Sequence, residues 1–216
     1  MSNTWIILGA TSSMARAFAR AVVARGDGVL LCGREMDDLQ ASASDAAARG
    51  APVAEAMAFD ARDSKSFAPI LNRAEGLDGT VSVAVFVGSM PPQDEIDATP
   101  DLIAGTIADS YAGPATFLTT IAPMLETKGG AVVGVGSVAG DRGRIGNYVY
   151  GSAKAGFHTY LAGLRNRLGR SDVHVVTVKP GFVDTAMTPT QCATCARRGQ
   201  QPPAPPKYRN VTPTAS

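Results

Sequence analysis

The segment WIILGATSSMAR, residues 5–16, decides the fold, because four apolar residues pass through a short run of small residues into an alanine-rich stretch. The apolar run predicts a buried β-strand, and the later residues repeat at helical spacing. A parallel strand needs a crossover to return to the same edge of its sheet, and this crossover is usually a helix. The segment therefore predicts a β-α unit at the start of a parallel sheet.

Outward from this segment, the same alternation repeats to about residue 180. Apolar runs typical of strands that are covered on both faces occupy residues 5–8, 28–32, 53–59, 81–87, 131–135 and 173–178. Periodic stretches between them predict helices over residues 13–25, 37–49, 64–74, 100–125 and 150–168. This order predicts an α/β fold with a doubly wound parallel sheet of the Rossmann type.

Length and charge exclude several classes of protein. The 216 residues suit one domain, and 20 basic against 19 acidic residues leave a net charge of +1, which predicts no nucleic-acid partner. No segment reaches the ~20 apolar residues of a membrane span, and no signal-peptide pattern is present. We expect a cytoplasmic protein with a small-molecule substrate. Cys192 and Cys195 form a CxxC without further ligands, so we predict no metal site.

Composition changes abruptly after Met187. Residues 188–216 are rich in proline, threonine and glutamine and contain no run that resembles a strand. We interpret residues 1–187 as a single domain and residues 188–216 as a proline-rich irregular tail. Such an ending predicts a fold that is C-terminally truncated or altered.

The turn at residues 9–16 predicts a nucleotide site, because small residues let the backbone approach a pyrophosphate at the N-terminus of the following helix. Only one of the three glycines usual in such turns is present, so an ordinary tight turn is the alternative. Ser13 stands at the second glycine position and offers a hydroxyl for a phosphate or for helix capping. The candidate contacts are Gly9, Thr11, Ser12, Ser13 and Met14.

Arg34 and Glu35 follow the second strand, ~20 residues past the turn, where a dinucleotide fold selects its ribose partner. An acid there accepts from a 2′-hydroxyl, whereas an arginine accommodates a 2′-phosphate. Arg34 comes first, so we predict NADP(H) rather than NAD(H), with a solvated charge pair as the alternative. Asp60, followed by Ala61, is a candidate contact for the adenine ring or a cap for the next helix.

The pentapeptide YGSAK, residues 150–154, places a tyrosine and a lysine one helical turn apart. An ammonium close to a phenol favours the phenolate and lowers its pKa, which would allow Tyr150 to exchange a proton. A half-exposed helix face is the alternative. Tyr148 has no lysine four residues later, and we expect it to line the substrate pocket.

Taken in order, these signals resemble the short-chain dehydrogenase/reductase family over residues 4 to about 187. Further signals are Gly88 after the fourth strand, Ser137 after the fifth and KPGFVDT, residues 179–185, after the sixth. Residues 140–150 also resemble a bacterial subgroup that includes reductases of polyprenyl-linked keto-sugars.

The resemblance implies hydride transfer between a nicotinamide and a carbonyl or secondary alcohol. It implies that Tyr150 is the general acid in reduction, and that Lys154 lowers the pKa of Tyr150 and binds the nicotinamide ribose. Ser137 would orient the substrate oxygen, with a turn or capping serine as the alternative. The implied cofactor contacts in the second half are Gly88, Tyr150, Lys154, Pro180, Gly181, Val183 and Thr185.

Three departures from the family stand out. Ser110 occupies the place of a helix-four asparagine that holds a water for proton relay, and Val87 replaces the asparagine of an Asn-Ala-Gly signature. The proline-rich ending replaces a substrate-covering helix and a last strand, which would weaken activity. We expect an NADP(H)-preferring oxidoreductase; the alternative is a catalytically impaired NADP(H)-binding or sensor protein. The long helices also suggest a homodimer.

Arg142 and Arg144 precede the predicted catalytic helix. They are either a site for an anionic substrate group, such as a phosphate, or solvated loop charges. The substrate itself does not follow from the sequence.

Overall fold

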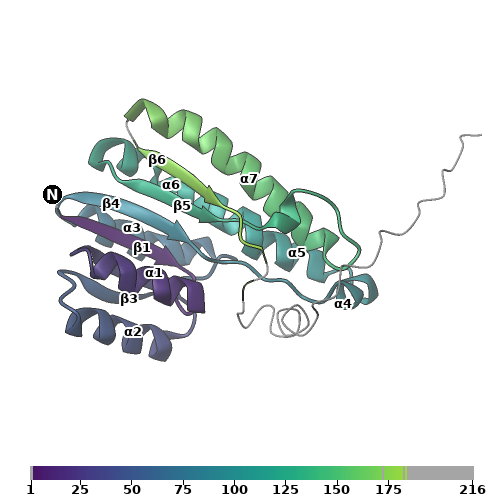
Figure 1. Ribbon diagram of the computed structural model, residues 1–216, viewed down its shortest axis with the longest axis horizontal. Helices are drawn as coiled ribbons and strands as arrows, with labels where there is room; N and C mark the ends of the chain where they lie inside the picture. Colours follow the sequence, from purple (N-terminus) through teal and green to yellow (C-terminus); the bar gives the residue numbers. More distant parts are fainter. Residues whose placement is uncertain (1, 172, 182, 184–216) are drawn as a thin grey trace, which may run out of the picture.

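The computed structural model describes residues 2–171, 173–181 and 183. Their six strands form one parallel sheet in the order β3-β2-β1-β4-β5-β6 (Figure 1). The strands are β1 (Asn3–Leu8), β2 (Gly28–Gly33), β3 (Ala54–Ala58), β4 (Thr80–Val85), β5 (Ala131–Val135) and β6 (His174–Val178). The predicted doubly wound sheet is confirmed.

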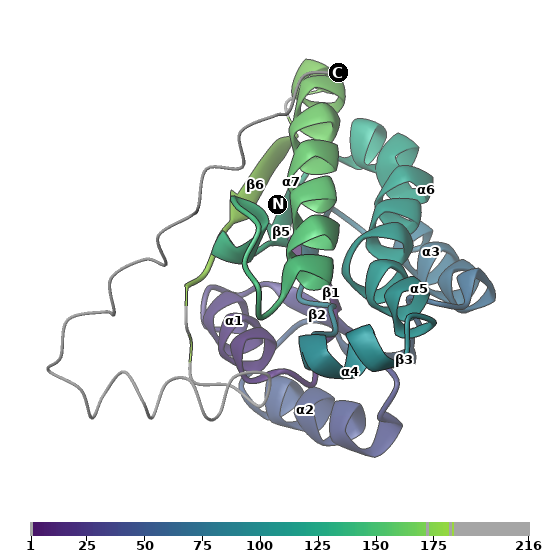
Figure 2. The ribbon, with the colours of Figure 1, turned by 90° about the vertical axis from the view of Figure 1, so that its right-hand side faces the viewer.

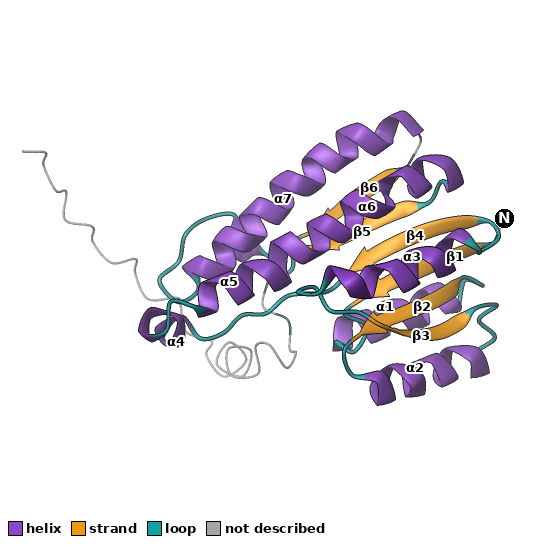
Figure 3. Cartoon of the chain, turned by 180° about the vertical axis from the view of Figure 1, so that it is seen from behind, coloured by secondary structure: helices purple, strands orange, loops and turns teal. Residues whose placement is uncertain are grey.

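Helices cover both faces of the sheet. On one face lie α1 (Ser13–Val23) and α2 (Met36–Ala48), as Figure 2 shows. On the other face lie α3 (Phe67–Glu75), α6 (Gly113–Lys128) and α7 (Tyr148–Leu168), which are in front of the strands in Figure 3. Each layer buries its own apolar core against the central strands β1, β2 and β4, whereas the edge strand β6 leaves Val176 and Val178 exposed, so the expected cover on both faces fails at this edge.

The helix predicted over residues 100–125 is found, but a π-helical turn interrupts it. The structure has a short helix α4 (Gln93–Ala98), then α5 (Leu102–Ile107), a π-helical turn η2 (Ala108–Ala112) and α6. Pro114 has no N–H for the carbonyl four residues earlier, which favours a wider turn at this point. The predicted helix over residues 64–74 also divides, into the 3₁₀ turn η1 (Ser64–Ser66) and α3.

An ion pair fixes this wider turn. Arg62 donates from Nε and Nη2 to the two carboxylate oxygens of the largely buried Asp109, both at 2.7 Å. Such a two-pronged pair sets orientation as well as distance. The loop after β3 and the turn η2 are thereby held together.

The strand order reverses between β1 and β4, because β1 pairs with both β2 and β4. Connections from such neighbouring strands leave to opposite faces, and a crevice opens at the carboxyl ends. The strand predicted over residues 81–87 ends at Val85, which leaves Phe86 and Val87 in the loop at this crevice. Thr185, the domain boundary at residue 187 and the tail at residues 188–216 lie outside the described residues.

Within the part of the chain that the structure describes, no helix has both the length and the apolar character needed to cross a membrane.

Candidate active site

Two adjoining cavities lie along the carboxyl edge of the sheet, and Phe86, Val87 and Gly88 line both. The predicted residues in the first cavity are Gly9, Thr11, Ser12, Arg34, Asp60, Ala61 and Gly88. Those in the second are Met14, Gly88, Ser137, Tyr150, Lys154, Pro180, Gly181 and Val183. Ser13 and Ser110 line neither cavity. A continuous groove of this kind suits an extended ligand with two dissimilar ends.

The turn after β1 brings the backbone at Gly9 close to the backbone of the loop that follows β4. Gly9 has a φ of +77°, and a Cβ at this position would lie only 3.0 Å from the backbone nitrogen of Val87. The backbone nitrogens of Gly9 and Ala10 donate to the carbonyl of Cys32 at the end of β2, at 2.9 and 3.1 Å. Ser12 caps α1, because its Oγ accepts from the backbone nitrogen of Ala15 at 3.2 Å.

Arg34 and Asp60 face the first cavity from the ends of β2 and β3. Arg34 is exposed and forms no ion pair with any residue that the structure describes. The Oδ1 of Asp60 accepts from the backbone nitrogen of Arg62 at 2.8 Å, which shapes the loop. The helix cap is Asp63, whose carboxylate accepts from the backbone nitrogen of Lys65. The capping alternative for Asp60 is therefore wrong.

Lys154 is buried at the base of the second cavity, with only 3% of its surface exposed. Its Nζ donates to the carbonyls of Val135 at 2.9 Å and Val87 at 3.4 Å, and lies 5.9 Å from the centroid of the Tyr150 ring. Burial lowers the pKa of Lys154 to about 8, because desolvation penalises the ammonium.

The expectation that the pKa of Tyr150 is lowered is not met. Burial raises the pKa of Tyr150, and a hydrogen bond with the Ser137 hydroxyl only partly opposes this effect. The ammonium of Lys154 is engaged by carbonyl groups rather than by the phenol. The phenol is consequently protonated at neutral pH, which is the form of a proton donor.

Ser137 has the capping role that its position suggested, and its orientation of a substrate oxygen stays a prediction. Its Oγ accepts from the backbone nitrogen of Ala139 at 3.1 Å and so caps the 3₁₀ turn η3 (Val138–Gly140). The same hydroxyl lies close enough to the phenol of Tyr150 to oppose the rise in its pKa. The strand end, the turn and α7 therefore meet at these two hydroxyl groups.

His158 was missed by the sequence-based prediction, although it lies eight residues after Tyr150 on the helix face that carries Lys154. Its Nε2 accepts from the backbone nitrogen of Ser137 at 3.2 Å. The ring is enclosed so tightly that a Cβ on Gly136 would lie 2.1 Å from Nε2. A side chain at residue 136 would displace the imidazole.

The hydrogen bond to Ser137 fixes the tautomer of His158. Because Nε2 accepts, the ring proton is on Nδ1, which faces Asp141 at 3.8 Å. Asp141 in turn accepts from Lys179 at 2.6 Å. Burial lowers the pKa of His158, and Lys179 and Lys154 lower it further, while Asp141 opposes them.

Ser110 is fully buried in the turn η2. Its Oγ donates to the carbonyl of Ser89 and accepts from the backbone nitrogen of the same residue, both at 3.2 Å. The backbone at Gly88 lies beside both Ser110 and Lys154, since a Cβ there would be 3.4 Å from Oγ and 3.3 Å from Nζ. The proposed hold on a relay water stays a prediction.

A second feature missed from the sequence is the contact of α4 with the start of α7. Buried Gln93 accepts at Oε1 from the backbone nitrogen of Val149 at 3.1 Å and donates from Nε2 to Asp97 at 3.0 Å. The Tyr148 hydroxyl donates to the same carboxylate of Asp97. Tyr148 is not among the residues that line the two cavities, so its predicted place in the pocket is wrong.

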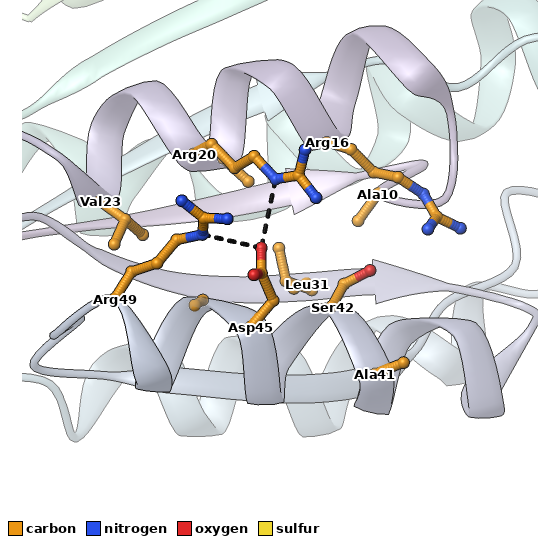
Figure 4. A pocket seen from close by; sticks show the side chains of 11 residues that line it. Ala10, Arg16, Arg20, Val23, Leu31, Ala41, Ser42, Asp45 and Arg49 are labelled. Atoms are coloured by element: carbon orange, nitrogen blue, oxygen red, sulfur yellow. Dashed lines mark hydrogen bonds and ion pairs between the residues drawn. The ribbon is translucent and has the colours of Figure 1, made fainter.

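A separate pocket between α1 and α2 is closed by paired charges (Figure 4). Asp45 accepts from Arg20 at 3.2 Å and Arg49 at 3.0 Å. Arg16 donates to Asp38 and to the carbonyl of Thr11, both at 3.1 Å. These contacts anchor the turn after β1 to α2.

Comparisons with known proteins agree with this geometry. A family model described as short chain dehydrogenase matches residues 3–195. An uncharacterized oxidoreductase of Mycobacterium tuberculosis is 32% identical over 185 residues, covering 85% of this chain and 74% of that relative.

Solved structures show the same fold. A short-chain dehydrogenase from Sphingobium yanoikuyae in complex with NADPH is 25% identical, with a TM-score of 0.77 over 86% of this chain and 73% of that one. A 3-oxoacyl-(acyl-carrier protein) reductase from Brucella melitensis with bound NAD is 22% identical, with a TM-score of 0.75 over 85% of this chain and 72% of that one.

Proposed function

Because the chain belongs to the short-chain dehydrogenase/reductase family, we propose that it is an oxidoreductase that uses NADP(H) to interconvert a carbonyl and a secondary alcohol. One observation carries the proposal: the hydroxyls of Ser137 and Tyr150 meet beside the buried Lys154, in a cavity that adjoins the turn after β1. A proton donor, an oxygen-orienting group and a cation are thus placed at one end of a dinucleotide-sized groove.

The groove fits a nicotinamide dinucleotide. Gly9 and Gly88 line the first cavity, where a pyrophosphate would pass, and Gly181 and Val183 line the second. Arg34, exposed and without an ion pair in the described part of the chain, would hold a 2′-phosphate. The complexes of the Sphingobium relative with NADPH and of the Brucella relative with NAD support a nicotinamide cofactor, and the preference for NADP(H) rests on Arg34. A reduced nicotinamide supplies a hydride when it is bound.

Tyr150 and Ser137 then act on the carbonyl oxygen. As the carbonyl carbon gains a hydride, the electron pair of its π bond moves to oxygen, which takes the hydroxyl proton of Tyr150. The hydroxyl of Ser137 accepts from the backbone nitrogen of Ala139, so its own proton is available to donate to the carbonyl oxygen of the substrate. The product is a secondary alcohol, and Tyr150 is left as a phenolate.

Lys154 stabilises this phenolate. Its charge is close to the Tyr150 ring, and its ammonium can return a proton toward the phenolate. We propose that Ser110 contributes to this relay by holding a water near η2. In alcohol oxidation each step is reversed, and the phenolate of Tyr150 is the base.

A second candidate function has its own observation. The hydroxyl of Ser110 donates to the carbonyl of Ser89 and accepts from its nitrogen. This hydroxyl is therefore less available to bind a water than the longer side chain of an asparagine would be. A protein with this feature binds NADP(H) but turns over slowly, as a sensor or binding protein would.

Two measurements test the proposal. NADPH should raise the melting temperature more than NADH at equal concentration, by linkage, and the absence of a shift with either contradicts both functions. NADPH oxidation is then followed with a panel of ketones that includes a keto-sugar, the narrower substrate class that residues 140–150 favour. Turnover supports the oxidoreductase, and a thermal shift without turnover supports the sensor.

A further inference from the structure

Arg144 lines the same cavity as Ser137, Tyr150 and Lys154. From its contacts we infer that Arg144 binds an anionic group, a carboxylate or a phosphate, on the carbonyl substrate. This inference rests on the proposed function and adds the class of substrate to it.

The guanidinium of Arg144 has an unmet hydrogen bond. Its Nε is buried and has no partner, a condition shared only by the Oγ of Ser89 among the buried side-chain atoms of the described residues. A buried N–H without an acceptor lowers stability, so such groups are uncommon unless a ligand completes them. The missing acceptor at Arg144 is what an anionic oxygen supplies.

No carboxylate of the described residues neutralises Arg144. Asp141 is close enough for Arg144 to lower its pKa slightly, but its carboxylate is paired with Lys179 at 2.6 Å. No other acid forms an ion pair with Arg144 in the part of the chain that the structure describes. Arginine presents its donors in a planar fork that matches a carboxylate or a phosphate.

The cavity as a whole is cationic. Its described lining contains two cations, Arg144 and Lys154, and no aspartate or glutamate. The ammonium of Lys154 already donates to the carbonyls of Val135 and Val87, whereas the Nε of Arg144 donates to no atom of the residues that the structure describes. The rest of the lining is largely apolar, with Phe86, Met90 and Val138 among its side chains. This combination suits a small molecule with an apolar body and one negative group.

The position of Arg144 relative to Tyr150 is fixed by the backbone. The carbonyl of Arg144 accepts from the backbone nitrogen of Asn147 at 3.2 Å, and the carbonyl of Asn147 accepts from the nitrogen of Gly151 at 2.8 Å. Arg144 is thus connected to the first turn of α7, which carries Tyr150.

The neighbouring arginine provides a matched control. Arg142 is exposed, lines neither cavity and is only two residues away. Of the two roles considered for this pair from the sequence, the structure supports the anion site for Arg144 and the solvated charge for Arg142.

The test compares Arg144→Met with Arg142→Met, each in the full chain with NADP⁺ bound. Dissociation constants are measured by ligand-observed NMR for 2-, 3- and 4-oxopentanoate against their methyl esters, and for dihydroxyacetone phosphate against dihydroxyacetone. We expect at least one acid or phosphate to bind wild type and Arg142→Met about 10- to 100-fold more tightly than its neutral partner. This preference should be lost in Arg144→Met.

The probes also identify the anion, because the acids and the phosphate are separate arms of the experiment. Equal binding of charged and neutral partners to wild type, or a preference that survives in Arg144→Met, overturns the inference. So does a loss of NADPH affinity in Arg144→Met equal to the loss for the acids, since Arg144 would then serve the cofactor. Turnover is measured separately, and its absence contradicts the proposed oxidoreductase without changing these binding outcomes.

Discussion

At the scale of single residues, burial of the Lys154 ammonium is unfavourable for folding. Among the residues that the structure describes, two carbonyls and no carboxylate hold the ammonium, and burial lowers its pKa to about 8. Relative to the ordinary value of 10.5, this shift corresponds to ~3 kcal/mol of destabilisation of the charged form in the folded chain. A charge retained at such a position is expected where chemistry requires it.

The first prediction concerns Lys154→Met. Below pH 8 the folded lysine is charged and its burial lowers stability; between pH 8 and 10.5 only the unfolded chain stays protonated, so wild-type stability recovers as pH rises. The variant should therefore gain stability relative to wild type at pH 7, and the gain should shrink toward pH 10. Urea unfolding at both pH values measures the difference. The exposed Lys65→Met is the control, and a gain that does not depend on pH contradicts the assigned pKa.

The second prediction concerns His158. Its pKa is lowered in the fold, so the neutral imidazole contributes stability above about pH 6.5 that is lost as pH falls through the folded pKa. The imidazolium cannot accept a hydrogen bond from the backbone nitrogen of Ser137. Because Ser137 is then less firmly positioned, kcat should fall at acid pH.

His158→Gln keeps an acceptor that does not titrate, and it should flatten the acid limb of the pH profile of kcat. The control is His174→Gln, because His174 is exposed on β6. An acid limb of equal steepness in His158→Gln and wild type shows that another group causes the fall.

At the scale of elements, the start of α7 is positioned by α4. Gln93 supplies the acceptor for the backbone nitrogen of Val149, and Tyr150 is the next residue. The position of Tyr150 at the start of α7 therefore depends on α4, a short helix that contributes no catalytic side chain.

Gln93→Met gives the third prediction. Methionine has a similar volume but leaves the nitrogen of Val149 without its acceptor, which should lower the free energy of unfolding by about 1–3 kcal/mol. The value of kcat should fall with it, because Tyr150 loses a fixed neighbour. Glu95→Met, an equivalent change on the exposed face of α4, is the control. Equal stability of the two variants in urea contradicts this role of Gln93.

The elements and the site were predictable from the sequence to different degrees. The strands were found because their runs are apolar, and the meeting of Ser137, Tyr150 and Lys154 in one cavity was predictable from their types and spacing, while their catalytic roles stay a prediction. The π-helical turn at Ala108–Ala112 was not predictable, because Pro114 is also compatible with the start of a helix, and the ion pair that accompanies the turn joins Arg62 and Asp109, which are 47 residues apart. His158 and Gln93 were missed because each accepts a hydrogen bond from a backbone nitrogen. Every residue except proline has such a nitrogen, so the contact cannot be predicted from a sequence pattern.

At the scale of the whole molecule, the reversal of strand order between β1 and β4 gathers loops from distant parts of the chain into one groove. The turn at Gly9, the loop at Gly88 and the segment Pro180–Gly181 meet there although more than 170 residues separate the first from the last. Backbone pairing of Gly136 with Val178 keeps the last of these loops beside Ser137. Fold and site are therefore consequences of the same topology.

The most direct test of the proposed chemistry is the rate of NADPH oxidation with a ketone substrate in Tyr150→Phe, compared with Tyr148→Phe. The second variant removes a hydroxyl two residues away that donates to Asp97 and lines neither cavity. We predict that Tyr150→Phe loses at least 100-fold in kcat while keeping its thermal shift with NADPH, and that Tyr148→Phe stays close to wild type. Unchanged turnover in Tyr150→Phe would contradict the assignment of Tyr150 as the proton donor.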